Sequence, residues 1–156
     1  MDVGMPNIYL KAGEFIMSSG PARVITVLGS CVSVTMFSER LGIGAICHAL
    51  LPKSTGAEDD FRFVDSSIVR MVKAFEKLNI RRHEIEVKLF GGADMFPDKT
   101  GSMMLSTIGQ QNVRIALSTL QRENLGLRAS DVGGRSGRKL YYYIHSNRVL
   151  VRKLKK

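Results

Sequence analysis

Short apolar, β-branched runs alternate with polar turns through most of the chain, which is the pattern of β-strands. A run at 24–28 ends at Gly29, and an alternating run at 32–37 follows as a second strand or as a continuation past a kink. A third apolar run covers 43–51, and apolar residues alternate with charged ones at 85–90. The first two thirds of the sequence are therefore expected to be rich in strands.

Two segments have the periodicity of amphipathic helices instead. In the first, apolar residues recur from Asp65, a predicted N-cap, to Asn79, a predicted end, and a second helix is expected at 107–124. Strand-like runs at 140–144 and 149–151 then predict a hairpin. Because strands outnumber helices and many neighbours look antiparallel, the predicted fold class is α+β, with mixed sheets and helices packed outside.

The composition is typical of a globular protein, with 44% hydrophobic and 24% charged residues. No repeat, low-complexity tract or linker divides the sequence, so we expect residues 1–156 to form a single domain. The longest apolar stretch, 24–37, is broken by polar residues and too short to span a bilayer, and the first residues lack a secretory signal. We therefore expect a cytoplasmic protein without membrane insertion, whose two cysteines stay reduced.

Charge is the unusual feature of the composition, because 23 Lys and Arg face 14 Asp and Glu and the net charge is +9. Such an excess first suggests nucleic acid or an anionic membrane as partner. Eight of the bases follow Val132, where no acid occurs, and the remaining 15 nearly balance the 14 acids. The basicity thus belongs to the terminal segment.

Cys31 and His48 are the strongest candidates for chemistry. Cys31 follows Gly29 and Ser30 at the end of an apolar strand, where a sharp turn can expose the thiol and the backbone N–H groups. If adjacent strands bring His48 within hydrogen-bond reach, its imidazolium lowers the pKa of the thiol and prepares a nucleophile. The alternative is a buried core cysteine beside a structural histidine. Cys47 neighbours His48, so it faces the opposite side of the strand and is interpreted as structural.

Other chemistry receives less support from the sequence. The Cys and His residues lack zinc-ligand spacing, so no metal site and no cofactor are expected. Gly91-Gly92 matches neither nucleotide-binding pattern. The glycine-rich segment 133–139 is either an anion-binding backbone cradle or a tight turn that enters a strand.

Taken together, six segments resemble the CheD family of chemoreceptor glutamine deamidases, which serve bacterial and archaeal chemotaxis. They occur in the expected order over nearly the whole chain and are 28–32, 44–52, 61–65, 88–95, 109–112 and 131–139. The resemblance implies a layered sandwich similar to the cysteine-hydrolase domain of deamidating toxins. It also implies that glutamine side chains on the cytoplasmic helices of a receptor become glutamate.

In that family the motif cysteine is the nucleophile and the motif histidine the base, roles that the resemblance assigns to Cys31 and His48. A threonine shortly before the cysteine is the third member, and Thr26 is the closest match. Thr26 and Cys31 are five residues apart, so a regular strand would place them on opposite faces, and a bulge or turn at Gly29 is needed to bring them together. The alternative is that a backbone carbonyl orients His48. The N–H groups near Ser30 and Cys31 are candidates to stabilise the oxyanion of a thioester mechanism.

Partners follow from the same resemblance: a chemoreceptor cytoplasmic domain as substrate and a CheC-type phosphatase as regulator, with methylesterase activity as a second reaction and no nucleic acid. The basic terminal segment would then form a rim facing the Glu-rich receptor helices. The alternative from another class is a non-catalytic basic adaptor that binds an acidic protein or nucleic acid through this segment.

Overall fold

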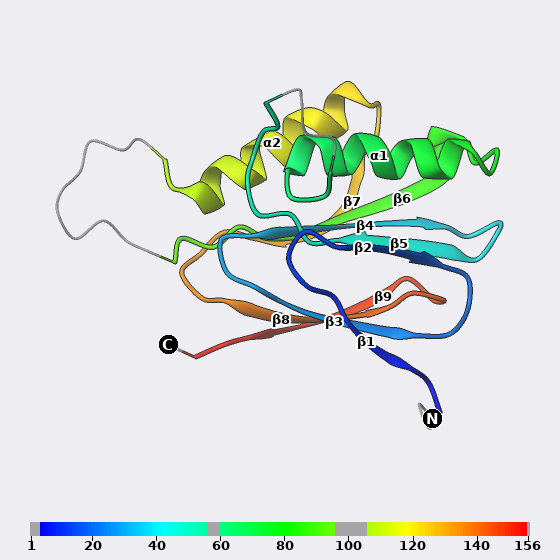
Figure 1. The fold of residues 1–156 in the computed structure, drawn as a ribbon, viewed down its shortest axis with the longest axis horizontal. Helices are drawn as coiled ribbons and strands as arrows, with labels where there is room; N and C mark the ends of the chain where they lie inside the picture. The colour runs from blue at the N-terminus through cyan, green and yellow to red at the C-terminus, as the bar shows by residue number, and fades with distance from the viewer. Residues whose placement is uncertain (1–3, 56–59, 96–105, 156) are drawn as a thin grey trace, which may run out of the picture.

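The chain folds into three layers, a pair of helices, a middle sheet and an outer sheet (Figure 1). The computed structural model describes residues 4–55, 60–95 and 106–155. The middle sheet has five strands in the order β2 (Phe15–Ser18), β5 (Ile43–Cys47), β4 (Val32–Ser38), β6 (Ile85–Gly91) and β7 (Leu127–Val132). The outer sheet has four, in the order β1 (Asn7–Tyr9), β3 (Arg23–Leu28), β8 (Arg138–Tyr143) and β9 (Arg148–Lys153).

The helices α1 (Val64–Glu76) and α2 (Ile108–Arg122) lie side by side on one face of the middle sheet (Figure 1). A short 3₁₀ turn, η1 (Arg82–Glu84), leads into β6. Apolar residues of both helices and of β4, β5 and β6 form one core cluster between these two layers. Because helices cover one face of the middle sheet and the outer sheet covers the other, every residue of β4 is buried.

A second core cluster fills the space between the two sheets. Val24 and Leu28 of β3 and Leu140 and Tyr142 of β8 point into it from the outer sheet. Ile46 of β5 meets them from the middle sheet. The inward residues of β8 alternate with partly exposed ones, which is the pattern of a sheet with one free face.

The predicted α+β class is confirmed, with two mixed sheets and the helices outside. Two strand pairs, β1–β3 and β6–β7, are parallel and the five other pairs between the named strands of the described residues are antiparallel. The segments 24–28 and 32–37 are separate strands, and they belong to different sheets. The chain therefore crosses between the sheets at Gly29, Ser30 and Cys31. The similarity to deamidating toxins stays a prediction.

One predicted helix start was wrong. Phe63, which makes no side-chain cap, is the N-cap of α1, and Asp65 lies within the first turn. The Asp65 carboxylate instead accepts hydrogen bonds from the N–H groups of Ser54 and Ser66, at 2.9 and 2.7 Å, and so ties the preceding loop to the helix. The predicted end at Asn79 is also late, because α1 ends at Glu76 with Lys77 as its C-cap, and Asn79 lies in the turn that follows, in the left-handed conformation with φ 60°. No helix in the described residues is long and apolar enough to cross a membrane.

Candidate active site

The turn that carries Cys31 is held by all three of its carbonyl groups. The carbonyl of Gly29 accepts from Ala93 N–H at 2.9 Å, and that of Cys31 accepts from Gly92 N–H at 2.8 Å. The carbonyl of Ser30 accepts from the side-chain amide of Asn112 at 2.9 Å. Three hydrogen bonds from two different elements thus fix the backbone of the crossover between the sheets.

These anchors also set the direction of two N–H groups. In a trans peptide the C=O and N–H bonds point in opposite directions. Because the Gly29 and Ser30 carbonyls point toward Ala93 and Asn112, the N–H groups of Ser30 and Cys31 point away from them. Among the described residues neither N–H donates to a carbonyl. Two neighbouring donors with this freedom are the chemical requirement of an oxyanion hole.

A glycine permits the close contact beneath the cysteine. Gly91 ends β6 with φ 104°, and a Cβ atom built on it would lie 2.2 Å from the Cys31 carbonyl oxygen. Both the conformation and the space therefore require glycine. Gly91 and Gly92, which match no nucleotide-binding pattern, form the backbone surface against which the Cys31 turn packs, called here the wall beneath Cys31.

His48 directly follows β5, and Cys31 directly precedes β4, the strand that pairs with β5. Val32 and Ala49 form an antiparallel bridge, with N–H to carbonyl distances of 3.0 and 2.9 Å, in the same register as the β4–β5 ladder. This register makes Cys31 and His48 diagonal neighbours on one face, whose Cα atoms in a regular ladder are about 7–8 Å apart. That face points toward the outer sheet. No hydrogen bond joins the two side chains in the described part of the chain.

Thr26 reaches His48 from the opposite sheet. Its hydroxyl is buried, donates to the Leu10 carbonyl at 2.8 Å, and lies 2.7 Å from Nδ1 of His48. A hydroxyl has one proton, and that proton is committed to Leu10. When that proton is donated to Leu10, the contact with His48 is donation from Nδ1–H to the Thr26 oxygen. The neutral ring then carries its lone pair on Nε2, the tautomer required of a base.

Thr26 and Cys31 do lie on the same interior, although not through a bulge. Thr26 faces inward from β3 of the outer sheet, between Val24 and Leu28, whereas Cys31 packs against the same core cluster from the middle sheet. Because the chain changes sheets at Gly29, the two side chains point into the same core and not to opposite faces of one strand. Gly29 has no left-handed conformation, and a Cβ on it would meet the Met95 side chain at 3.0 Å.

Burial shifts the pKa values of both groups toward their neutral forms. It raises the pKa of the Cys31 thiol, with a smaller opposite effect of the Cys31 N–H. It lowers the pKa of His48, an effect that the Leu10 carbonyl and the Glu14 carboxylate partly offset. Burial thus acts on both groups in the direction opposite to the predicted thiolate–imidazolium pair, which stays a prediction.

Cys47 occupies the other face of β5, as predicted. It is fully buried in the cluster beneath the helices, and burial raises the pKa of its thiol to about 11. Both cysteines are free thiols. The two thiols of this chain thus differ in accessibility, since Cys31 retains partial exposure.

Asn112 is the main site residue to which sequence reasoning gave no role. It is fully buried on α2, and its amide nitrogen donates to the Ser30 carbonyl and also to the Leu50 carbonyl, both at 2.9 Å. One side chain thus joins the Cys31 turn to the segment that carries His48. The sequence feature that could have indicated it is a polar side chain on the apolar face of the predicted helix, four residues before Ala116.

The glycine-rich segment near the C-terminus forms a turn around a buried cation. Arg138 is 2% exposed and donates to the carbonyls of Gly91 and Gly133, at 3.4 and 2.9 Å. It also pairs with the Asp131 carboxylate at 3.1 Å. Arg138 therefore supports the wall beneath Cys31 and is unavailable to a basic rim, which corrects the sequence-based interpretation of this residue.

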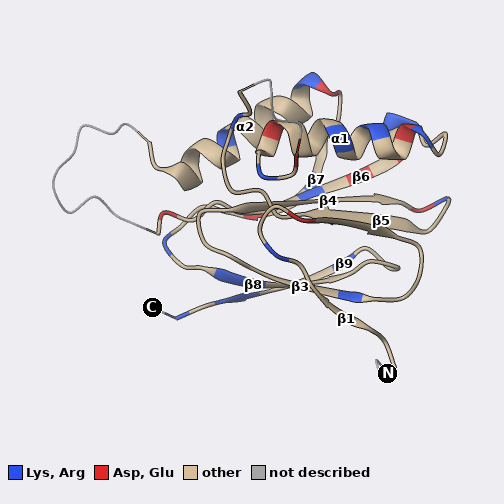
Figure 2. Cartoon of the chain, viewed as in Figure 1, with Lys and Arg blue, Asp and Glu red and all other residues tan. Residues whose placement is uncertain are grey.

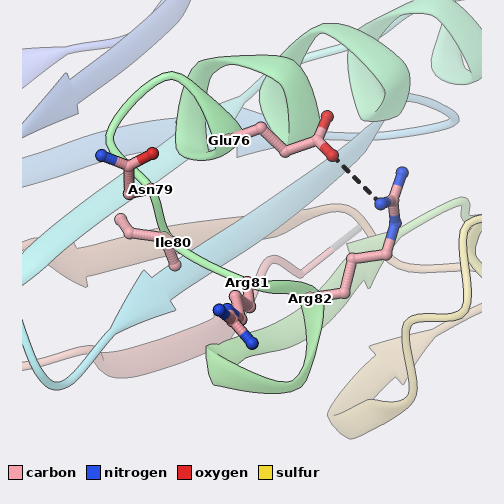
Figure 3. Close-up of a pocket in the computed structure, with 5 residues that line it drawn as sticks. All are labelled: Glu76, Asn79, Ile80, Arg81 and Arg82. Carbon is pink, nitrogen blue, oxygen red and sulfur yellow. Dashed lines mark hydrogen bonds and ion pairs between the residues drawn. The ribbon is translucent and has the colours of Figure 1, made fainter.

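Two hollows differ in their relation to these groups. One, of about 410 Å³, is bordered by Thr26, His48 and Lys139. Another, of about 500 Å³, lies at the end of α1, where Arg82 pairs with the Glu76 carboxylate at 3.1 Å (Figure 3). Arg82 also pairs with the Glu123 carboxylate at 3.0 Å. The second hollow borders none of the predicted site residues, and its ion pairs join the ends of the two helices. In the described ranges, no cluster of His, Cys, Asp or Glu could hold a metal ion.

Comparison with known proteins agrees with the sequence motifs. The family model described as CheD chemotactic sensory transduction matches residues 50–153. A Geobacter sulfurreducens protein named probable chemoreceptor glutamine deamidase CheD 2 is 50% identical over 96% of this chain and 91% of its own length. A Thermococcus kodakarensis protein named probable chemoreceptor glutamine deamidase CheD is 34% identical over 95% of this chain and 93% of its own.

Proposed function

The chain belongs to the CheD family, and from this premise we propose that it hydrolyses selected glutamine side chains of a chemoreceptor cytoplasmic domain to glutamate, with Cys31 as nucleophile. The observation that carries the proposal is the contact of Thr26 with His48 beside the anchored Cys31 turn. A cytoplasmic location follows from that substrate.

The first half of the reaction forms a thioester. Nε2 of His48 takes the thiol proton of Cys31 while Sγ bonds to the amide carbon of glutamine, and the carbonyl oxygen becomes an oxyanion. The N–H groups of Ser30 and Cys31 donate to that oxyanion. When the tetrahedral intermediate collapses, the C–N bond breaks and the imidazolium protonates the departing nitrogen. Ammonia leaves, and His48 is neutral again.

The second half hydrolyses the thioester. His48 takes a proton from water as the oxygen attacks the acyl carbon, and a second tetrahedral intermediate forms. The C–S bond breaks, the thiolate recovers its proton from His48, and glutamate is released. The same attack on a glutamate methyl ester would expel methanol in place of ammonia, so methylesterase activity belongs to the proposal.

Two residues position these groups without touching substrate. Thr26 accepts from Nδ1–H of His48 and thereby keeps Nε2 free to act as base. Asn112 holds the Ser30 carbonyl, which belongs to the same peptide unit as the Cys31 N–H. We assign both as positioning residues, and a CheC-type phosphatase as the regulatory partner.

The test is to incubate a purified chemoreceptor cytoplasmic fragment with the protein and to follow glutamine-to-glutamate conversion by peptide mass spectrometry. Cys31→Ala is expected to lower kcat by a factor on the order of a thousand or more, because the nucleophile is lost. Cys47→Ala is the matched control, since it removes the buried thiol on the other face. Conversion that survives in Cys31→Ala would disprove the enzymatic proposal.

The adaptor alternative predicts no conversion but retention of an acidic ligand. A deletion of the basic terminal segment is unsuitable as its test, because β9 pairs with β8 along its length and Val149 and Val151 pack into the core between the sheets. Point variants on the exposed side of β9 leave this packing intact.

A further inference from the structure

Among the residues that the structure describes, no layer covers the outer face of the outer sheet, because both helices lie on the far side of the middle sheet (Figure 1). We call this the open face. A row of apolar side chains crosses it, set by strand register: Tyr9 is paired with Ile25, Ile25 with Tyr141, and Tyr141 with Leu150. Ile25 is buried within this row and Tyr141 is half-buried. Tyr9 and Leu150, at the two ends, are 67% and 44% exposed.

Basic side chains flank this apolar row on both sides. In the register row on one side, Arg23 and Arg148 both pair with Tyr143, and on the other side Lys139 pairs with Arg152. The Arg23 guanidinium and the Lys139 ammonium lie 5.7 and 5.6 Å from the centre of the Tyr141 ring. The open face therefore combines an apolar stripe with cations on both flanks.

The charge balance of the outer sheet has no counterpart in the middle sheet. The four outer strands contain six Lys and Arg and no Asp or Glu, whereas the five middle strands contain two of each sign. Figure 2 shows the same contrast between the outer sheet and the mixed charges of the helices. Of the six cations Arg138 is buried, and Lys153, its register partner, lies on the opposite face from Arg152. The remaining four therefore define the sign of the open face.

The open face also adjoins the candidate active site. The hollow of about 410 Å³ beside Thr26 and His48 is bordered by Tyr9, Val27 and Lys139, which belong to the open face. It lies where β1 ends at Tyr9 and the chain leaves the edge of β3. A ligand on the open face would thus lie next to the groups that position the base.

We propose that the open face is the docking surface for an acidic segment of the protein substrate, whose own apolar stripe covers the row from Tyr9 to Leu150. This proposal rests on the proposed function and names the surface that selects its substrate. Carboxylates of the substrate would pair with the cations on both flanks, while the target glutamine enters beside β3. Charge complementarity of this kind mainly increases the association rate and lowers KM.

Single-stranded nucleic acid fits the open face less well. Such ligands stack their bases on exposed aromatic rings. Tyr141, the central ring, already has cations over it, and its neighbours in the row, Ile25 and Leu150, are aliphatic. The apolar stripe suits a polypeptide better than a row of bases.

The test reverses two exposed charges at the edge strand. Arg148→Glu combined with Arg152→Glu is expected to raise KM for a chemoreceptor cytoplasmic fragment roughly tenfold at low salt, with kcat unchanged, because rim charges act on association. The increase should fade near 1 M salt, where the Debye length is about 3 Å. Toward a short uncharged glutamine peptide, kcat/KM should stay as in the wild type.

The matched control places the same change of net charge on the helical layer. Lys73→Glu combined with Lys77→Glu alters exposed residues of α1 and its C-cap, and KM should change less than twofold. Thermal unfolding of both double variants checks that each is folded. If the Glu variant does not fold, Arg148→Gln with Arg152→Gln removes the charges without reversing them.

Binding measured without turnover separates the docking surface from the chemistry. In a Cys31→Ala background, the dissociation constant for the fragment should rise with the open-face substitutions and not with the α1 substitutions. An unchanged dissociation constant overturns the docking proposal, whether or not the enzyme is active. Absent turnover with the expected binding pattern overturns the proposed function alone. If the substitutions abolish only the binding of a single-stranded DNA oligomer, the face is a nucleic-acid site and the proposal is wrong.

Discussion

The middle and outer sheets are built from strands of similar length, yet they differ in what surrounds them. All seven residues of β4 are buried, whereas β8 alternates strictly between buried and partly exposed positions. The middle sheet lies between helices and a second sheet, and the outer sheet has one open face. This difference divides the work of the site between them, because a doubly covered sheet holds its residues rigidly and an open one can meet a partner.

The proposed nucleophile belongs to the covered side of this division. Cys31 enters the middle sheet through a turn whose three carbonyl groups are all bonded. Thr26, which contacts His48, comes from the outer sheet. The hollow beside these two residues is also bordered by open-face residues such as Val27 and Lys139. The proposed reaction therefore takes place at the seam of the two sheets, with rigidity on one side and access on the other.

The largest expected effect is on Gly91, which contacts the turn of the proposed nucleophile. Gly91→Ala should lower the free energy of unfolding by roughly 2–4 kcal/mol, since the added methyl meets the Cys31 carbonyl at 2.2 Å and the conformation is left-handed. Gly133→Ala is the matched control, with φ 82° but open space around its Cβ, and should cost only about 1 kcal/mol. Urea denaturation measures both, and equal losses would show that the contact contributes nothing.

Removal of the amide that anchors the Cys31 turn should act on catalysis. Asn112→Leu leaves the Ser30 and Leu50 carbonyls without their donor, so kcat should fall roughly tenfold to a hundredfold, less than the loss of an oxyanion donor itself. KM should stay nearly constant, because the residue touches no substrate. Steady-state kinetics on the receptor fragment measures this split.

Thr119→Val is the control for that substitution. Thr119 is also buried on α2, and its hydroxyl has no hydrogen-bond partner among the described residues. Its removal should leave kcat unchanged within about twofold. Equal kcat losses in the two variants would mean that Asn112 acts only through the stability of the helix.

A smaller effect is expected where the outer sheet meets the base. Thr26→Val removes the acceptor of the His48 Nδ1–H bond, and kcat should fall on the order of tenfold, a fraction of what acid–base catalysis contributes. Thr26→Ser keeps the hydroxyl and should retain most of the activity. If Thr26→Val were fully active, the orientation of His48 would depend on the backbone alone.

The smallest effect concerns the pH profile of the unmodified protein. Burial lowers the pKa of His48 below 6.5, so the neutral base persists to lower pH than that of a free histidine. As pH falls through this pKa the base is protonated, and kcat/KM should decline with an acid limb below 6.5. On the alkaline side, burial raises the pKa of the Cys31 thiol above its ordinary value.

The pH dependence of kcat/KM for the receptor fragment measures the acid limb. Activity that stayed constant far below the limb would instead indicate a preformed thiolate–imidazolium pair, in which the protonated histidine is the working form.

Periodicity predicted most elements of both sheets, and it failed for particular reasons. β1 and β2 are three and four residues long, which is too short for an alternating pattern to be recognised in the sequence. β7 is an edge strand with mostly exposed or half-buried residues, so its sequence lacks the apolar run of a buried strand. Asp65 is a residue type that favours the N-cap position, but its carboxylate instead accepts a hydrogen bond from Ser54 in the neighbouring loop.

Some properties of the site residues could be predicted from nearby sequence, and others depend on contacts with residues far away in the chain. Cys31, His48 and Thr26 were named from motifs, and the opposite placement of Cys47 followed from alternation within one strand. The anchoring role of Asn112 depends on a carbonyl 82 residues away along the chain, which no local pattern encodes. The sign of the Cys31 pKa shift also required the packing, since burial and not a neighbouring charge determines it.

By itself the sequence determined the family, the α+β class, the candidate nucleophile and base, and the excess of positive charge, because each depends on residue identity and short-range periodicity. Tertiary structure alone decided that the chain changes sheets at Gly29, that Thr26 holds His48 from the opposite sheet, and that the cations gather on one open face. These features depend on which strands become neighbours. Strand pairing is settled by burial and hydrogen bonding over the whole chain, and neither can be read from a single segment.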